Sequence, residues 1–138
     1  MHRMILSGLL WTALCGAAAA EKTAYQCAIN GTSGRQWIQP LIFFALDRAI
    51  DRVVVSDASI LGFNDGVPVE GTLVRDNAAR VTVSWELDMR SSSNQTVRMN
   101  YRATFLKANG KVNVSARPLG YEGLFSQAGT CTVTKLSD

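Results

Sequence analysis

The sequence predicts an all-β domain, a single antiparallel meander of about seven to nine strands that closes, or nearly closes, into a barrel. Three observations predict this class. Apolar and polar residues alternate along several segments, turn-forming residues separate those segments, and a cysteine lies near each end of the predicted domain. Such alternation is typical of antiparallel strands with one face on a core and one in water. A two-sheet β-sandwich pinned by a disulfide is the alternative architecture.

The amino-terminal 20 residues have the features of a secretory signal peptide. Basic residues precede an apolar stretch, residues 5–16, that is shorter than the roughly 20 residues a membrane helix needs. Small residues then favour cleavage before Glu21. We therefore expect a signal peptide over residues 1–20 and one β-barrel-like domain over residues 21–138.

A lipoprotein is the alternative interpretation of this leader, with lipid attached at Cys15. Leu14 stands where that processing needs a small residue, so ordinary cleavage is favoured. No later apolar run is long enough to cross a bilayer as a helix. The expected location is therefore the periplasm or the outside of a bacterial cell, with no transmembrane segment.

Four strands are expected in the first half of the domain. They cover residues 24–29, 41–47, 51–57 and 69–75. The segment 47–51 between two of them is either a tight connection or a turn of helix. Turns are expected at Asn64-Asp65-Gly66 and at Asp76-Asn77. A bulge or an odd-length loop is expected after Arg75, because a regular four-residue loop would set the apolar Leu73 against the polar Thr82.

The alternation is cleanest in the second half of the domain. The expected strands cover residues 80–88, 96–107, 111–117 and 130–135. Asn109-Gly110 predicts a two-residue hairpin turn, because a type I′ turn needs positive φ at both central positions.

Matching the apolar faces predicts the strand registers. Across the hairpin, Phe105 is expected opposite Val114, and Ala103 opposite Ala116. For the preceding pair of strands, the same matching predicts two further partnerships. These are Trp85 with Met99, and Glu86 with Arg98.

The two cysteines of the predicted domain, Cys27 and Cys131, are expected to form a disulfide. An even number of cysteines in an oxidising compartment favours a bridge, and no histidine accompanies them to suggest a thiolate site. Each cysteine falls on the apolar face of its strand. A bond would bring the first and last strands within about 7 Å, which is most simply satisfied by a closed barrel.

The sequence contains no recognisable catalytic or metal-binding set. Its single histidine, His2, lies in the predicted leader, so no nucleophile–base pair and no zinc site can be assembled in the domain. A formal net charge of +3, with the arginines scattered along the chain, does not predict a nucleic-acid partner. We expect no enzyme activity, no metal and no cofactor.

Two groups of carboxylates are candidate sites. Glu86 and Asp88 share one strand face and could in principle form an acid–base pair, but arginines on the neighbouring strand favour a solvated, charged surface. Asp47, Asp51 and Asp57 lack a calcium-loop pattern, so solvated strand ends are the favoured interpretation.

Two aromatic residues, Trp37 and Tyr121, fall outside the clean strand patterns and are the speculative ligand-binding candidates. They could line the mouth of a barrel, where a ligand would enter. They could equally plug one end of the core, and the plug is favoured.

Six stretches together resemble a group of small exported proteins of alphaproteobacteria with no established activity. The stretches are Tyr25-Gln-Cys27, Trp37-Ile-Gln-Pro40, Arg80-Val-Thr-Val-Ser-Trp85, Tyr101-Arg-Ala-Thr104, Ser115-Ala-Arg-Pro-Leu-Gly-Tyr121 and Gly129-Thr-Cys131. The resemblance covers nearly all of the domain and implies a periplasmic location, but it supplies no functional residues.

The opening Tyr25-Gln-Cys27, followed by Gly31, is also similar to the start of periplasmic inhibitors of c-type lysozyme, which are small β-barrels. The remainder departs from that family: the chain is longer, and Thr32-Ser33-Gly34 is in a different part of the chain from the family's Ser-Gly inhibitory loop.

The expected function is therefore a non-catalytic periplasmic binding module for a small apolar ligand or an envelope or host protein. Two alternatives stay open. One is an accessory or structural subunit of a cell-envelope assembly, and the other is a protein like the lysozyme inhibitors. A cavity lined by Trp37 or Tyr121 would favour a ligand, and a filled core with an exposed apolar patch would favour a protein partner.

Overall fold

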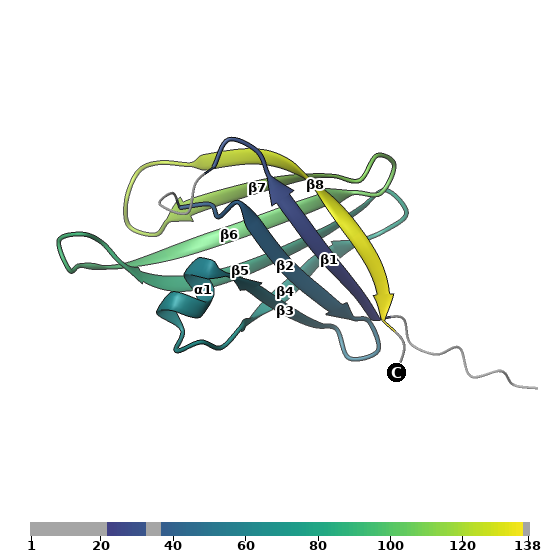
Figure 1. The fold of residues 1–138 in the computed structure, drawn as a ribbon, viewed down its shortest axis with the longest axis horizontal. Coiled ribbons are helices and arrows are strands. Elements are labelled where there is room, and N and C mark those ends of the chain that lie inside the picture. The colour runs from purple at the N-terminus through teal and green to yellow at the C-terminus, as the bar shows by residue number, and fades with distance from the viewer. Residues whose placement is uncertain (1–21, 33–36, 137–138) are drawn as a thin grey trace, which may run out of the picture.

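The described part of the chain, residues 22–32 and 37–136 of a computed structural model, forms a closed barrel of eight antiparallel strands (Figure 1). Each strand pairs with its sequence neighbours, and the last strand pairs with the first. The predicted meander and its closure are therefore confirmed, and the sandwich alternative is not what forms. The predicted signal peptide lies outside the described residues.

The strands and the single short helix follow one another along the chain. Their bounds are β1 Lys22–Ile29, β2 Leu41–Asp47, β3 Arg52–Asp57, α1 Ala58–Phe63, β4 Val69–Asp76, β5 Arg80–Arg90, β6 Thr96–Leu106, β7 Lys111–Pro118 and β8 Phe125–Leu136. Each of the eight predicted strands corresponds to one of these. The largest difference is at β8, which begins at Phe125 because Phe125 pairs with Ala116 of β7 despite its weak local pattern.

The apolar side chains used to predict the registers of β5, β6 and β7 are buried, but two predicted registers are wrong by one inward position. Ala103 lies opposite Val114, and Phe105 lies opposite Val112. Four residues rather than two connect these strands, residues 107–110, with Gly110 at φ 72°. The longer loop shifts the pairing without exchanging the faces, because strand side chains alternate with a period of two.

The pairing of β5 with β6 differs in the same way. Trp85 lies opposite Tyr101, and Asp88 rather than Glu86 lies opposite Arg98. The predicted irregularity near Arg75 is confirmed, since the register of β4 against β5 shifts between Leu73 and Arg75. The bulge therefore lies inside β4 rather than after it.

The helix α1 was not predicted, and it corrects the interpretation of Asp57. The Asp57 carboxylate accepts a hydrogen bond of 2.8 Å from the backbone N–H of Ile60 and so caps the helix. Asp57 is only 5% exposed, so it is not a solvated strand end. The side chain of Ile60 is fully buried and packs the helix against the core.

The barrel interior is filled by side chains, as expected for eight strands. Tyr25 stacks on Phe44 with ring centroids 4.5 Å apart, and Phe105 meets Tyr25 edge-on at 5.1 Å. Farther along the barrel, Trp85 stacks on Tyr101 at 5.3 Å. These rings belong to one continuous apolar cluster that includes inward-facing residues of β1, β2, β3, β5, β6 and β7.

In a meander, alternate connections lie at the same end of the barrel. We call one end the helix end; it holds residues 30–32, 37–40, 58–68, 91–95 and 119–124. We call the other the terminal end; it holds residues 48–51, 77–79 and 107–110, with the start of β1 and the end of β8. No helix among the described residues is long and apolar enough to cross a membrane.

Candidate functional site

The disulfide between Cys27 and Cys131 is present. The two residues are direct partners in the pairing of β1 with β8, with Cα atoms 4.0 Å apart. The Cys27 side chain is 1% exposed and belongs to the core. Structural disulfides persist in oxidising environments, so the bond indicates a non-cytoplasmic compartment.

Trp37 lies at the helix end of the barrel, where it is partly buried and packs against the core. Its backbone carbonyl accepts a 2.7 Å hydrogen bond from the hydroxyl of Tyr101. Its indole ring lies 6.3 Å from the ring of Phe125, which faces the same end from β8. The contact with the core is compatible with the favoured interpretation of Trp37 as a plug.

The Tyr101 hydroxyl that holds Trp37 is itself deep in the protein. Burial raises the pKa of Tyr101, and the nearby Asp57 carboxylate raises it further. The tyrosine therefore stays protonated and remains a hydrogen-bond donor to Trp37. This donor ties the loop between β1 and β2 to the interior of the barrel.

Tyr121 lies at the same end but differs from Trp37, because its side chain is 58% exposed. It belongs to the connection between β7 and β8, where several large apolar side chains are exposed by 42–58%. We call this set the apolar loop patch; it consists of Leu119, Tyr121, Leu124 and Phe125.

The local sequence explains the shape of this connection. Pro118 ends β7, and the backbone N–H of Leu119 then donates to the carbonyl of Arg98 at 2.8 Å, which ties the loop to β6. Gly120 and Gly123 both have positive φ, at 84° and 136°, which side-chain-bearing residues rarely adopt. The two glycines therefore allow the chain to turn on either side of the exposed Tyr121.

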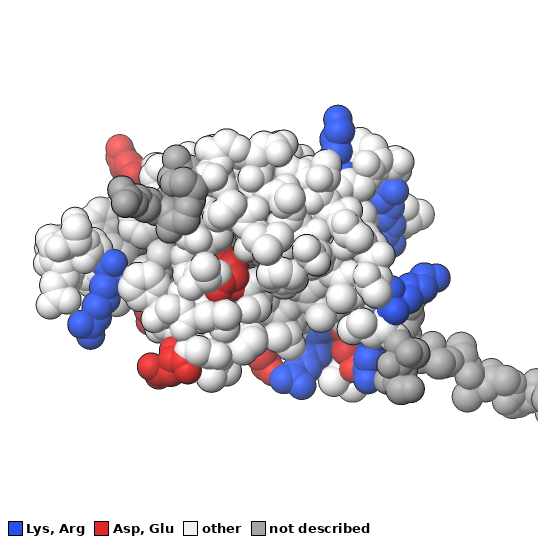
Figure 2. Space-filling view, viewed as in Figure 1, with Lys and Arg blue, Asp and Glu red and all other residues white. Residues whose placement is uncertain are grey.

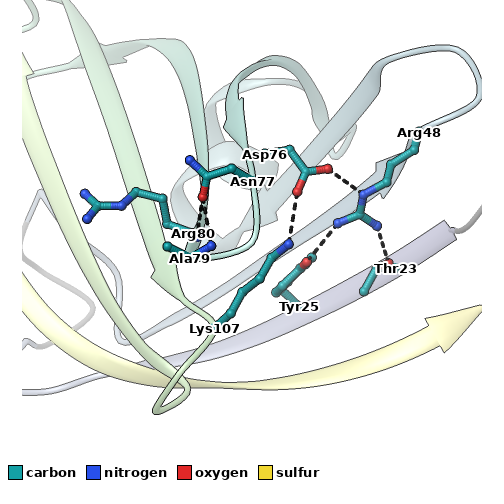
Figure 3. Close-up of polar contacts among 8 residues, drawn as sticks. All are labelled: Thr23, Tyr25, Arg48, Asp76, Asn77, Ala79, Arg80 and Lys107. Carbon is teal, nitrogen blue, oxygen red and sulfur yellow. Dashed lines mark hydrogen bonds and ion pairs between the residues drawn. The ribbon is translucent and has the colours of Figure 1, made fainter.

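A second group of polar side chains lies at the terminal end, and the local sequence pattern does not predict it. Arg48 donates from Nε to Asp76 at 2.6 Å, from Nη1 to Thr23 at 2.7 Å and from Nη2 to the Tyr25 hydroxyl at 3.4 Å (Figure 3). Lys107 donates to the other oxygen of Asp76 at 3.3 Å. These contacts join side chains from four separate segments of the barrel.

The charges in this group influence one another. The hydrogen bond from Arg48 is the main reason that the pKa of Asp76 is lowered, and Lys107 lowers it further. In return, the bond to Asp76 raises the pKa of Arg48. Asp76 is therefore a carboxylate under ordinary conditions, and Arg48 and Lys107 are cations beside it.

The candidate acid–base pair, Glu86 and Asp88, lines an open depression beside α1. Asp88 accepts hydrogen bonds of 2.9 and 3.5 Å from the guanidinium of Arg98. This contact lowers the pKa of Asp88, so its carboxyl is suited to accepting hydrogen bonds rather than to donating a proton. The arrangement is that of a charged outer surface.

The outer wall formed by β8, β1, β2 and β3 has a different character. Figure 2 shows this face of the molecule largely free of charged side chains, which gather mainly around its edge. A shallow groove of about 250 Å³ crosses it, lined by small side chains such as Ala24 and Ala45 and by the ring of Phe43. Phe43 is 41% exposed.

Among the described residues, no group of three or more histidine, cysteine, aspartate or glutamate side chains is placed to hold a metal ion. Comparison of the chain with protein-family models, with curated proteins and with solved structures found no match.

Proposed function

We propose that this protein is an exported, non-catalytic binding module that recognises a protein partner through the apolar loop patch at its helix end. The observation that carries this proposal is the exposure of Leu119, Tyr121, Leu124 and Phe125 beside an interior already filled by side chains. Contiguous exposed apolar groups are typical of interaction surfaces.

The filled interior argues for a surface interaction over an enclosed ligand. The positions where a barrel would hold a small apolar molecule are taken by Tyr25, Phe44, Trp85 and Tyr101, each at most 3% exposed. At the helix end, Trp37 is partly buried and packs against the same core cluster. A partner would therefore meet the outside of this end.

The composition of the patch favours a protein as the partner. Tyrosine and phenylalanine side chains are enriched in the central parts of protein interfaces. The loop is fixed at its start by the bond from Leu119 to the β6 backbone, so only part of it would have to be ordered on binding. The periplasmic or extracellular location expected from the leader makes an envelope or host protein the partner we propose.

A site-specific photocrosslinker tests the proposal. The crosslinking amino acid is placed at Tyr121 in the full chain, exported through its own leader. The matched control places it at Ile50, which is 64% exposed at the opposite end of the barrel. We expect a discrete crosslinked protein band from Tyr121 and none from Ile50.

Equal crosslinking from both positions, or none from either, would overturn the proposal.

Purified c-type lysozyme is included as a defined partner in a direct binding titration, because of the resemblance of the opening residues to its inhibitors. Native mass spectrometry of the exported protein tests the alternative that the barrel holds a small ligand. A retained adduct of a few hundred daltons would show that the barrel holds a small ligand instead.

A further inference from the structure

The terminal end of the barrel contains an open depression of about 380 Å³ whose walls are charged. Three cationic side chains and one carboxylate line it: Arg48, Lys107, Lys135 and Asp76. Below the charged groups, the depression is bounded by the rings of Tyr25 and Phe105. It lies at the opposite end from the apolar loop patch, so it is independent of the function proposed above.

The cluster has more donors than acceptors. A guanidinium group has five N–H donors, and the side chain of Arg48 makes three hydrogen bonds among the described residues. The ammonium of Lys107 has three donors and makes one such bond. Both oxygens of Asp76 already accept a bond. The remaining donors are therefore available to water or to a ligand that enters the depression.

The donors are also held in place before any ligand arrives. Arg48 is fixed from three directions by Thr23, Tyr25 and Asp76, and Figure 3 shows Lys107 turned toward the same carboxylate. The side chains of Arg48 and Lys107 are 24% and 36% exposed. Partial burial beside aromatic rings strengthens a charge interaction relative to bulk water, and fixed side chains lose less entropy on binding.

We propose that this depression binds a small oxyanion, a carboxylate or phosphate group, through the N–H groups of Lys107 and Arg48 that do not contact Asp76. Charge-assisted bonds from an ammonium and a guanidinium are the usual means of holding such groups. Asp76 orients both cations and competes with the ligand for them. The depression is open to solvent, so the oxyanion can be a free ion or the end of a larger molecule.

Inorganic phosphate is the first probe, titrated into the isotopically labelled protein at constant ionic strength and followed by amide NMR. We expect saturable shifts in residues 48–51, 77–79 and 107–110. Lys107→Gln should weaken binding by about tenfold, the loss of one charge-assisted contact. Asp76→Asn should tighten it by a similar order, because the internal competitor is removed.

Arg117→Gln is the matched control, because Arg117 is an exposed arginine on the outer side of β7. Its affinity for phosphate should equal that of the unsubstituted protein. Equal losses in Lys107→Gln and Arg117→Gln would mean that only overall charge matters and would overturn the site. An intact NMR spectrum will first show that Asp76→Asn is folded. If this folded variant then binds phosphate more weakly, Asp76 does not compete with the ligand for Arg48 and Lys107.

Glycerol phosphate is the second probe and distinguishes the source of the oxyanion. Tighter binding than inorganic phosphate would support a phosphate carried by a larger molecule, and equal binding would support a free ion. If neither probe gives saturable shifts at the terminal end, the proposal is wrong. Lys107→Gln keeps the test decisive even if Asp76→Asn does not fold.

Discussion

Cys27 and Cys131 are bonded directly across the β1–β8 pairing, which is the pairing that closes the barrel. They are separated by 104 residues in the sequence. Of all the strand pairings, the pairing of β1 with β8 closes the longest loop and therefore has the largest entropic cost, and the disulfide joins these two strands. The disulfide and the closure of the sheet therefore stabilise the same contact.

Replacing both cysteines should accordingly destabilise the protein by about 2–4 kcal/mol, because the unfolded chain regains the freedom that the bridge removes. Cys27→Ala with Cys131→Ala avoids a free thiol, and urea unfolding gives the free energy. Alkylation of the denatured protein without reductant provides the check. An intact mass with two added labels per chain would show that the bridge does not form.

Gly129 provides a test of how closely β8 approaches β1. A Cβ atom added there would overlap the backbone carbonyl oxygen of Ala28 and press on the Cα of Ile29. We expect Gly129→Ala to cost about 1–3 kcal/mol in urea unfolding, because two paired strands would have to move apart.

The control for this substitution is Gly62→Ala in the helix α1, where the added Cβ meets nothing within 4 Å. Alanine is the better helix former, so this variant should be unchanged or more stable by up to about 1 kcal/mol. Similar losses in both variants would contradict the close packing of β8 on β1.

The strands were predictable because apolar and polar residues alternate along a strand that has one face buried and one face in water. Val81, Val83 and Trp85 alternate with polar residues, and all three are buried. The registers were less predictable, because they depend on loop length. Asn109-Gly110 predicts a tight turn, but the loop is longer, and each inward residue shifts to the next inward partner.

The charged cluster could not be found from local pattern, because its members are distant in the sequence. Arg48 lies in the segment 47–51, predicted to be a tight connection or a turn of helix, and Asp76 lies in a predicted turn. A signal did exist: in a meander, alternate connections lie at one end, so the connections holding Arg48, Asn77 and Lys107 had to meet. Which side chains point inward there is decided by packing rather than by sequence.

The buried cap Asp57 should make stability depend on pH. Burial raises the pKa of its carboxyl, although hydrogen bonds from the backbone N–H groups of Ile60 and Ser59 oppose the shift. The folded state then holds the proton more tightly than the unfolded state. The contribution of Asp57 to stability should therefore be most favourable at acid pH and be lost as pH rises from the unfolded pKa through the folded pKa.

Asp57→Asn should remove this pH dependence and leave stability at neutral pH equal or higher, because asparagine keeps the cap without a buried charge. Asp57→Ala loses the cap and should cost about 1 kcal/mol. Urea unfolding across the acid range compares the three proteins. A loss for Asp57→Asn as large as for Asp57→Ala would show that the charge itself stabilises the helix.

Asp76 should have the opposite pH dependence. Arg48 and Lys107 lower its pKa, so the unfolded state binds the proton more readily. The stabilisation is present above the unfolded pKa and is lost as pH falls through the folded pKa. At about pH 7, Asp76→Asn should cost on the order of 1–2 kcal/mol, because Arg48 loses a charged acceptor in a partly buried position.

That cost should shrink as unfolding is measured at progressively lower pH, because protonation of the native Asp76 removes the charged acceptor. Glu70→Gln is the control: Glu70 pairs with Arg52 at 3.0 Å, but the two side chains are 71% and 56% exposed. An exposed pair contributes less than about 1 kcal/mol, so this variant should change little across the same pH range. If Asp76→Asn and Glu70→Gln cost the same, the cluster at the terminal end contributes no more than an ordinary surface ion pair.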